Sequence, residues 1–177
     1  MGSITIQLGD KMAENQKIYH QAFIEGVKIK ELKPILDDRG MLMEILRSDE
    51  PVFERFGQAY VTVCNPGVVK GWHYHKLQVD HFVCLQGTAK VVLYDPRENS
   101  KTVGKINEFI ISRENPLLIK IPTFVYHGFT ALENQTAMIL NISTEVYRHS
   151  SPDEFRADPF SPEIPYDWGD VDRTVSR

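Results

Sequence analysis

A regular series of short, strand-like segments in the middle of the chain constrains the fold most. β-Branched and aromatic residues gather there in short runs, and turn-forming residues such as Pro66-Gly67, Gly87 and Asp95-Pro96 separate them. The runs cover residues 58–65, 79–86, 88–95, 106–112, 116–122 and 136–143. Short strands at this spacing are typical of an antiparallel β-sandwich or barrel. The sequence therefore predicts an all-β domain.

The flanking segments predict smaller additions to this domain. Residues 24–33 alternate apolar and charged side chains, as a half-buried strand does, and a turn over 37–40 leads into a second strand. Ser48, followed by two acidic residues, predicts a short peripheral helix over 48–56. We expect residues 1–16 to be disordered or vector-derived, and 17–177 to form one domain. The proline-rich tail, about 148–177, is expected to lie over the surface as a lid on one barrel mouth.

Composition excludes several classes of function. The chain has 177 residues and a net charge of −4, so it offers no basic surface for nucleic acid or membrane. No apolar run approaches the roughly 20 residues of a membrane span, and the N-terminus lacks the apolar core of a secretory signal. Cys64 and Cys84 lie inside apolar runs, which favours free thiols in a reducing compartment. A cytoplasmic location is expected.

Polar residues with chemical potential gather around residue 75. His73 and His75 lie two apart in a strand-like run, so their imidazoles share one face. Asp80 follows in the same block, and His127 comes later in the chain. Three imidazoles and a carboxylate suit a divalent metal such as Zn, Fe, Mn or Ni, or an acid–base cluster. A hydrogen-bonded polar cluster without metal is the third interpretation, and the residues alone leave all three open.

Two spacings resemble those of the cupins. The block Gly67-x5-His73-x-His75-x4-Asp80-x6-Gly87 is similar to the first cupin motif, with Asp where Glu is commoner. Pro122-x4-His127 keeps the proline and the histidine of the second motif. The resemblance implies a double-stranded β-helix, or jelly roll.

From about residue 26 to residue 168 the chain resembles the dTDP-4-dehydrorhamnose 3,5-epimerase family of nucleotide-sugar enzymes. The matching pieces are Asp38-Arg39-Gly40-x3-Glu44, Gln58, Gly67-x2-Lys70-Gly71-Trp72-His73-Tyr74, Asp95-x-Arg97, Ile121-Pro122-x4-His127-Gly128-Phe129, Ser143-Thr144-x2-Tyr147, Asp158-Pro159 and Trp168. The resemblance implies a nucleotide-sugar substrate, no required cofactor, and a homodimer in which the partner subunit completes each site.

The same resemblance implies roles for individual residues. His73 matches the base that removes protons from the carbons beside a 4-keto group, and Asp158 matches the carboxylate that orients it. A histidine suits this work because it titrates near neutral pH and can take and return a proton. His127 matches a position that supports the base or the substrate. Substrate binding is implied for Arg39, Glu44, Gln58, Lys70 and Tyr147, with Arg39 and Lys70 at diphosphate-binding positions.

Four positions depart from the family pattern. Asp80 replaces a lysine that stabilises the enolate, Asn141 replaces a tyrosine acid, His75 replaces a glutamine, and Met41 replaces a base-stacking aromatic residue. Two of these changes introduce metal-ligand types, so a metal is a candidate replacement for the lysine. The His-x-His-Lys pattern also resembles sugar-nucleotide 3,4-ketoisomerases, in which two histidines shuttle protons. The alternative function is a metal-binding cupin of other chemistry, or a non-catalytic binding protein, that has lost 3,5-epimerase activity.

Overall fold

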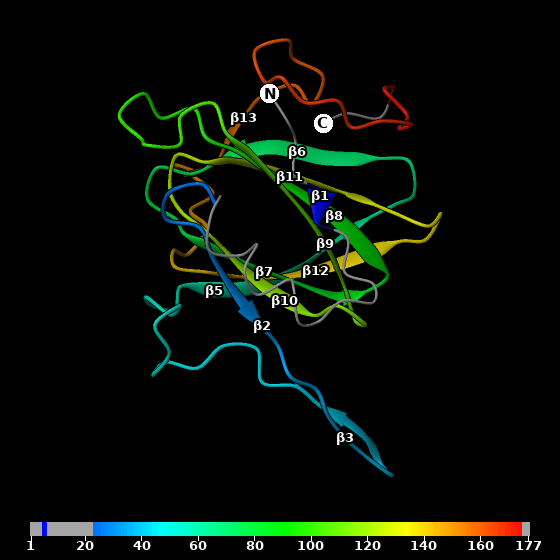
Figure 1. Cartoon of the computed structure of the whole chain (residues 1–177). Helices are drawn as coiled ribbons and strands as arrows, with labels where there is room; N and C mark the ends of the chain where they lie inside the picture. Colours follow the sequence, from blue (N-terminus) through cyan, green and yellow to red (C-terminus); the bar gives the residue numbers. More distant parts are fainter. Residues whose placement is uncertain (1–4, 7–22, 175–177) are drawn as a thin grey trace.

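Two facing β-sheets build the domain (Figure 1). The computed structural model describes residues 5–6 and 23–174. One sheet has the order β1 (Thr5–Ile6), β9 (Ile106–Ser112), β8 (Thr88–Tyr94), β11 (Tyr126–Ala131), β6 (Val69–Tyr74) and β13 (Phe155–Arg156). The other has the order β2 (Lys28–Glu31), β10 (Leu117–Ile121), β7 (Asp80–Gln86), β12 (Ala137–Ser143) and β5 (Gln58–Cys64). All six predicted central runs form strands, which confirms the all-β, jelly-roll prediction.

Apolar side chains from both sheets fill the space between them. Val91 and Phe109 of the six-stranded sheet and Ile119 and Ile139 of the five-stranded sheet are all at most 1% exposed. Strand β12 alternates strictly between buried and half-buried residues, because successive side chains of a strand point to opposite faces. Each fully buried side chain of this kind contributes about 1.5–3 kcal/mol. The core therefore holds the two sheets at a fixed separation beside the site.

The predicted helix over residues 48–56 is wrong, because residues 48–52 form turns and residues 53–56 are irregular. Pro51 disfavours a helical backbone at the residue before it, Glu50. The Glu50 carboxylate instead accepts hydrogen bonds from Lys30 Nζ of β2 at 2.7 Å. None of the described residues forms a helix. Accordingly, the described part of the chain contains no helix long and apolar enough to span a membrane.

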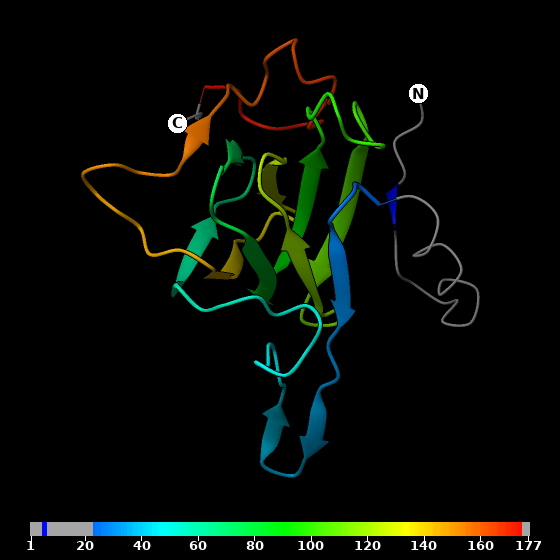
Figure 2. The ribbon, with the colours of Figure 1, turned by 90° about the vertical axis from the view of Figure 1, so that its left-hand side faces the viewer.

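A two-stranded hairpin projects from the body of the domain (Figure 2). It consists of β3 (Ile35–Asp37) and β4 (Gly40–Leu42), joined by the turn that the sequence predicts. Gly40 has a φ of 136°, a conformation that side-chain-bearing residues rarely adopt. The apolar residues Ile35, Leu36 and Leu42 are 63%, 75% and 59% exposed. The hairpin thus carries apolar surface that the described part of the chain leaves uncovered.

The C-terminal tail covers the outer face of the six-stranded sheet. Strand β13 pairs with β6, and Trp168 and Tyr166 pack against Trp72 with ring centroids 4.9 and 6.0 Å apart. The lid predicted over 148–177 thus lies on a sheet face, and only its first part borders the space between the sheets. Residues 175–177 lie outside the described part.

The expectation for residues 1–16 also lies outside the described residues, apart from β1. This two-residue strand runs parallel to β9, with Thr5 opposite Glu108.

Candidate functional site

A cavity of about 180 Å³ lies between the two sheets. Strand β6 supplies His73 from one sheet, and β5 supplies Tyr60 from the other, so these side chains belong to opposite walls. The lining residues are Tyr60, Thr62, Lys70, His73, His75, Phe82, His127, Phe129, Glu154 and Arg156. Aromatic rings and ionisable groups therefore share one pocket, a combination typical of a small-molecule site.

His73 is half-buried on the cavity wall. Its Nε2 atom lies 4.0 Å from Oε1 of Glu154, which in turn accepts a hydrogen bond from Arg156 Nε at 2.6 Å. Burial, with repulsion from the neighbouring His127, lowers the pKa of His73 to about 4. The imidazole is consequently unprotonated at neutral pH and able to accept a proton.

The carboxylate that faces His73 is Glu154, and Asp158 lies elsewhere. Asp158 is exposed, and its Oδ1 atom accepts a hydrogen bond from the backbone N–H of Phe160 at 2.8 Å. Strand β13 pairs Arg156 directly with His73, which brings the preceding Glu154 to the imidazole. The structure therefore does not bring Asp158 to the base in the orienting role that the resemblance implies.

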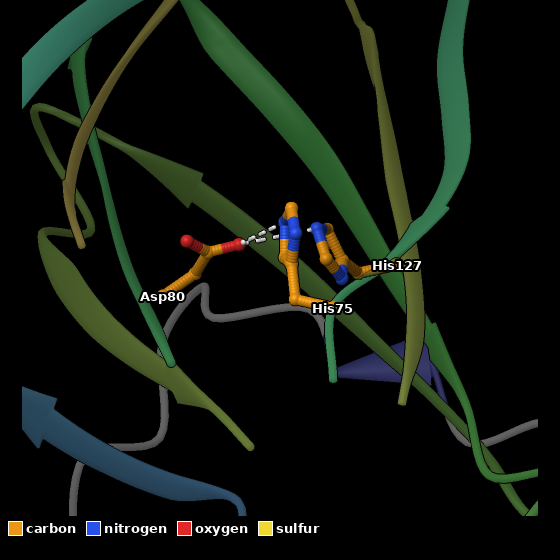
Figure 3. A group of neighbouring side chains, drawn as sticks. All are labelled: His75, Asp80 and His127. Carbon is orange, nitrogen blue, oxygen red and sulfur yellow. Dashed lines mark ion pairs between the residues drawn. The ribbon is translucent and has the colours of Figure 1, made fainter. Parts of the chain in front are cut away.

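His75, Asp80 and His127 meet beside the cavity (Figure 3). The Nε2 atoms of His75 and His127 lie 3.2 and 3.3 Å from Oδ2 of Asp80, which is 1% exposed. One ligand atom from each residue lies within 4.8 Å of the others. The fourth predicted ligand, His73, stands outside this group, with its ring centroid 6.2 Å from that of His127. Three of the four predicted metal ligands are thus together.

Hydrogen bonds hold Asp80 in place. Its Oδ1 atom accepts from Gln78 Nε2 at 2.7 Å and from Asn141 Nδ2 at 2.8 Å. Burial alone would raise the pKa of Asp80, but its interactions with His127 and His75 outweigh burial and hold that pKa well below its usual range. Asp80 is therefore a carboxylate, and its negative charge is fixed beside His75 and His127, which line the cavity.

The two histidines of this group are oriented through their other ring nitrogens. Nδ1 of His75 contacts the carbonyl oxygen of Asp153, and Nδ1 of His127 lies 3.2 Å from the carbonyl oxygen of Val125. A carbonyl only accepts hydrogen bonds, so each Nδ1 carries the proton. Burial lowers the pKa of His75, but the interactions with Asp80 outweigh burial and leave that pKa raised.

Asp153 ties the tail to the loop that carries His75. Its carboxylate accepts three backbone N–H groups, from Lys76 at 3.0 Å, Leu77 at 2.8 Å and Gln78 at 2.9 Å. The same residue provides the carbonyl that orients His75. One tail residue thereby fixes both the backbone and the tautomer at this end of the site.

The residues predicted to bind substrate are dispersed. Lys70 lines the cavity, where its Nζ donates to Thr62 Oγ1 at 2.6 Å. Gln58 accepts a hydrogen bond from the backbone of Tyr147 at 3.1 Å, and neither residue lines the cavity. Arg39 and Glu44 are outside the cavity as well. Arg39 lies in the hairpin turn with a 90% exposed side chain, and Glu44 follows the hairpin and pairs with Arg47.

Tyr60 and Glu154 are site residues that sequence reasoning missed. Tyr60 lies in a predicted strand whose inward face was not identified, although its alternation with Thr62 and Cys64 carries that information. Glu154 reaches the site through the pairing of β13 with β6, about 80 residues earlier in the chain, and no local pattern reveals such a pairing.

Known proteins match this chain over most of its length. The dTDP-4-dehydrorhamnose 3,5-epimerase family matches residues 21–177. The spore coat polysaccharide biosynthesis protein SpsL of Bacillus subtilis is 41% identical over 82% of this chain and 96% of its own. The probable low-salt glycan biosynthesis epimerase Agl13 of Haloferax volcanii is 39% identical over 81% of this chain and 89% of its own.

Solved structures agree with the sequence comparison. A dTDP sugar isomerase from Desulfovibrio desulfuricans G20 superimposes with a TM-score of 0.78 at 34% identity, covering 85% of this chain and 96% of that one. These matches confirm the prediction of a sugar-nucleotide epimerase or isomerase with a jelly-roll fold. The chain therefore belongs to the dTDP-4-dehydrorhamnose 3,5-epimerase family.

Proposed function

We propose that this protein epimerises or isomerises a dTDP-4-keto-6-deoxyhexose by removing a proton beside the ketone, with His73 as the base. The observation that carries this proposal is the His73 imidazole on the wall of a partly closed cavity, with the Glu154 carboxylate 4.0 Å from Nε2. A family relative supports the substrate class: the epimerase of Legionella pneumophila, 29% identical with a TM-score of 0.71, forms a complex with dTDP-4-keto-L-rhamnose.

The chemistry follows from the positions of the charges. A proton on a carbon beside a ketone is acidic because the resulting carbanion is delocalised as an enolate. When His73 takes that proton, Glu154 stabilises the imidazolium that forms, and a base of this kind contributes roughly 10²–10⁴-fold. Lys70, on the same cavity wall, supplies a cation for the diphosphate, although an ammonium lacks the bidentate geometry of arginine.

Proton exchange tests the proposal directly. The protein is incubated in D₂O with a dTDP-4-keto-6-deoxyhexose, and the hydrogens at C3 and C5 are followed by NMR. Exchange at both carbons indicates a 3,5-epimerase, and exchange at C3 alone indicates a 3-epimerase or a 3,4-ketoisomerase. His73→Asn should abolish exchange. Absence of exchange by the wild type, together with tight metal binding, would favour the alternative of a metal-binding cupin with other chemistry.

The same proposal includes a divalent metal held by His75, Asp80 and His127. Because each Nδ1 is protonated, both Nε2 atoms present lone pairs to Asp80. Oδ2 of Asp80 is buried and has no hydrogen-bond donor among the described residues. Three electron-pair donors thus converge on one point, and carbonyl groups behind the imidazoles are the usual support of histidine ligands.

The spacing of the donors also suits a metal. Tetrahedral bonds of about 2.0–2.1 Å place neighbouring ligand atoms about 3.3 Å apart, close to the 3.2 and 3.3 Å between Oδ2 and the two Nε2 atoms. When bound, such an ion would supply a Lewis acid that polarises the keto oxygen, the role of the family lysine that Asp80 replaces. The competing cation is a proton on His75, whose pKa Asp80 raises against the effect of burial.

Metal content distinguishes these two cations. Protein purified and dialysed without added metal is analysed by mass spectrometry, and about one equivalent per chain is expected. Asp80→Asn and His75→Ala should lose the metal, while exposed His149→Ala, a matched control, should retain it. The proposal fails if no stoichiometric metal is found and added metals bind the wild type no better than His75→Ala.

A homodimer completes the proposed site. Arg39 is carried on the hairpin formed by β3 and β4, which exposes Ile35, Leu36 and Leu42. Insertion of this hairpin into a partner subunit would cover that apolar surface and deliver the guanidinium to the partner's diphosphate. The exposed apolar area is the support for this arrangement, because large uncovered apolar patches mark interaction sites.

A mixing experiment tests the dimer. Arg39→Ala and His73→Asn are each expected to be nearly inactive, whereas random re-assortment of the two should restore about a quarter of the wild-type activity, since half the dimers then carry one intact site. No recovery in mixed dimers verified by light scattering would show that Arg39 serves its own chain or none.

A further inference from the structure

Inversion at a carbon needs two proton carriers, because the proton leaves one face of the enolate and returns to the other. His73 supplies a carrier on the six-stranded sheet. The tyrosine acid of the family matches Asn141, and an amide does not donate a proton to a carbanion. If the proposed function holds, another group must supply the second proton.

Tyr60 occupies the facing wall of the same cavity. It lies on β5 directly opposite Asn141 of β12, and cross-strand partners point to the same side of a sheet. The phenol therefore reaches the cavity from the strand next to the one that carries the family's tyrosine. His73 and Tyr60 both line the cavity from different sheets. A flat enolate between these sheets would present one face to each residue.

The hydrogen bonds around Asn141 fix the direction of the phenol hydrogen. Oδ1 of Asn141 accepts the backbone N–H of His81 at 3.1 Å, which identifies the other amide atom as nitrogen. Its two hydrogens go to Asp80 Oδ1 at 2.8 Å and to Tyr60 Oη at 2.9 Å. Tyr60 Oη is therefore an acceptor in this network. No acceptor for its own hydrogen occurs among the described residues, so that hydrogen is available to a ligand.

The electrostatic surroundings keep this hydrogen in place. Tyr60 is 41% exposed, and the burial of the rest of its side chain, together with the nearby negative charge of Asp80, raises its pKa to about 12. The phenol is accordingly protonated at neutral pH, and it remains far more acidic than a carbon beside a ketone. These are the properties of a donor that releases its proton only to a developing carbanion.

We propose that Tyr60 is the catalytic acid that delivers a proton to the enolate on the face opposite His73. This inference rests on the proposed function. His73 accepts the C–H proton, and the electron pair passes to the enolate. The enolate carbon then forms a new C–H bond with the Tyr60 hydrogen, and the O–H bond breaks to leave a phenolate. Solvent returns a proton to the phenolate and removes one from the imidazolium, so the enzyme regains its initial state.

The test separates proton removal from inversion. Tyr60→Phe should keep C–H exchange in D₂O within about tenfold of the wild type, because His73 is intact, and should lose inverted product by at least about 100-fold. Tyr94→Phe, which removes a hydroxyl outside the cavity, should retain both activities. Wild-type inversion by Tyr60→Phe would overturn the role of Tyr60 alone. A wild type that exchanges no proton would overturn the proposed function and this inference with it.

Discussion

Gly71 is the position where one added methyl group should disturb the site most directly. It lies on β6 two residues before His73, and faces Gly128, which follows His127 on β11. A Cβ atom at residue 71 would lie 2.8 Å from the Gly128 Cα and 3.4 Å from the His127 carbonyl oxygen. Both contacts are with backbone, so no side chain is able to rotate away. Gly71→Ala must therefore push the two strands apart.

The required displacement sets the expected size of the effect. Ordinary contact begins at 3.4 Å, so the strands must separate by about 0.6 Å. Overpacking of this kind costs about 1–3 kcal/mol, which corresponds to a fall in Tm of about 2–12 °C for a domain of this size. A misplacement of 1 Å costs about 100-fold in rate, so a shift of about 0.6 Å predicts a loss of about tenfold.

Thermal unfolding followed by circular dichroism, and exchange in D₂O followed by NMR, measure both effects. Gly104→Ala is the matched control, because its φ of 76° strains alanine while no atom lies within 4 Å of the added methyl group. That control should lower Tm through backbone strain of about 1–2 kcal/mol and leave the exchange rate unchanged. Wild-type exchange by Gly71→Ala would refute the argument that the close approach of β6 and β11 positions the histidines.

Three further predictions concern charge. Glu154→Gln should lower kcat about tenfold with little change in KM, because the His73 imidazolium loses its counter-ion. Steady-state kinetics measure both constants, and an unchanged kcat would contradict this prediction. Lys70→Ala should raise KM at least about tenfold while kcat changes little, as expected of a phosphate contact. An unchanged KM would show that Lys70 does not bind the diphosphate. Asp95→Asn should cost about 3 kcal/mol at pH 7, because it breaks a buried pair with Arg97 at 2.7 Å. Burial opposes ionisation of Asp95, but hydrogen bonds from Arg97, Ser100 and Thr102 lower its pKa, so this stabilisation should be lost progressively as the pH falls below the ordinary pKa of 3.8. Urea unfolding of the wild type and of Asp95→Asn at pH 7 and pH 3 measures the difference in the free energy of unfolding. An equal difference at both pH values refutes the prediction.

The strands were predictable because their pattern is local. The alternation along β12 and the turn that precedes β4 each involve only a few consecutive residues, so both can be predicted from the sequence. The segment over 48–56 was mispredicted because the signals at Ser48 are also local, whereas the contact between Lys30 and Glu50 joins residues 20 positions apart. Tertiary contacts outweighed a weak helix propensity there.

In the candidate site, too, the contacts set by local spacing were predictable and those set by strand pairing were not. Motif spacing predicted that His75, Asp80 and His127 would lie together, and the structure groups these three residues, with Asp80 on β7 and His127 on β11. Strand parity predicted that His73 would join them, but β6 ends at Tyr74, and His75 beyond it takes its orientation from Asp153. Glu154 and Tyr60 depend on which strands become neighbours, and that pairing is a property of the whole fold.

The position of Asp153 has a consequence for the order of synthesis. Strand β12 ends at Ser143, and only the two-residue β13 follows it in the two sheets, so nearly all of the core emerges from the ribosome before the tail does. Until Asp153 and Glu154 arrive, the loop over 76–78 lacks the carboxylate that accepts its amides, and His73 lacks its counter-ion. A chain that ends at residue 150 contains β12 and all strands before it, and it lacks both of these carboxylates. Under the proposed function, the site is therefore complete only once residues 153 and 154 have joined the core strands.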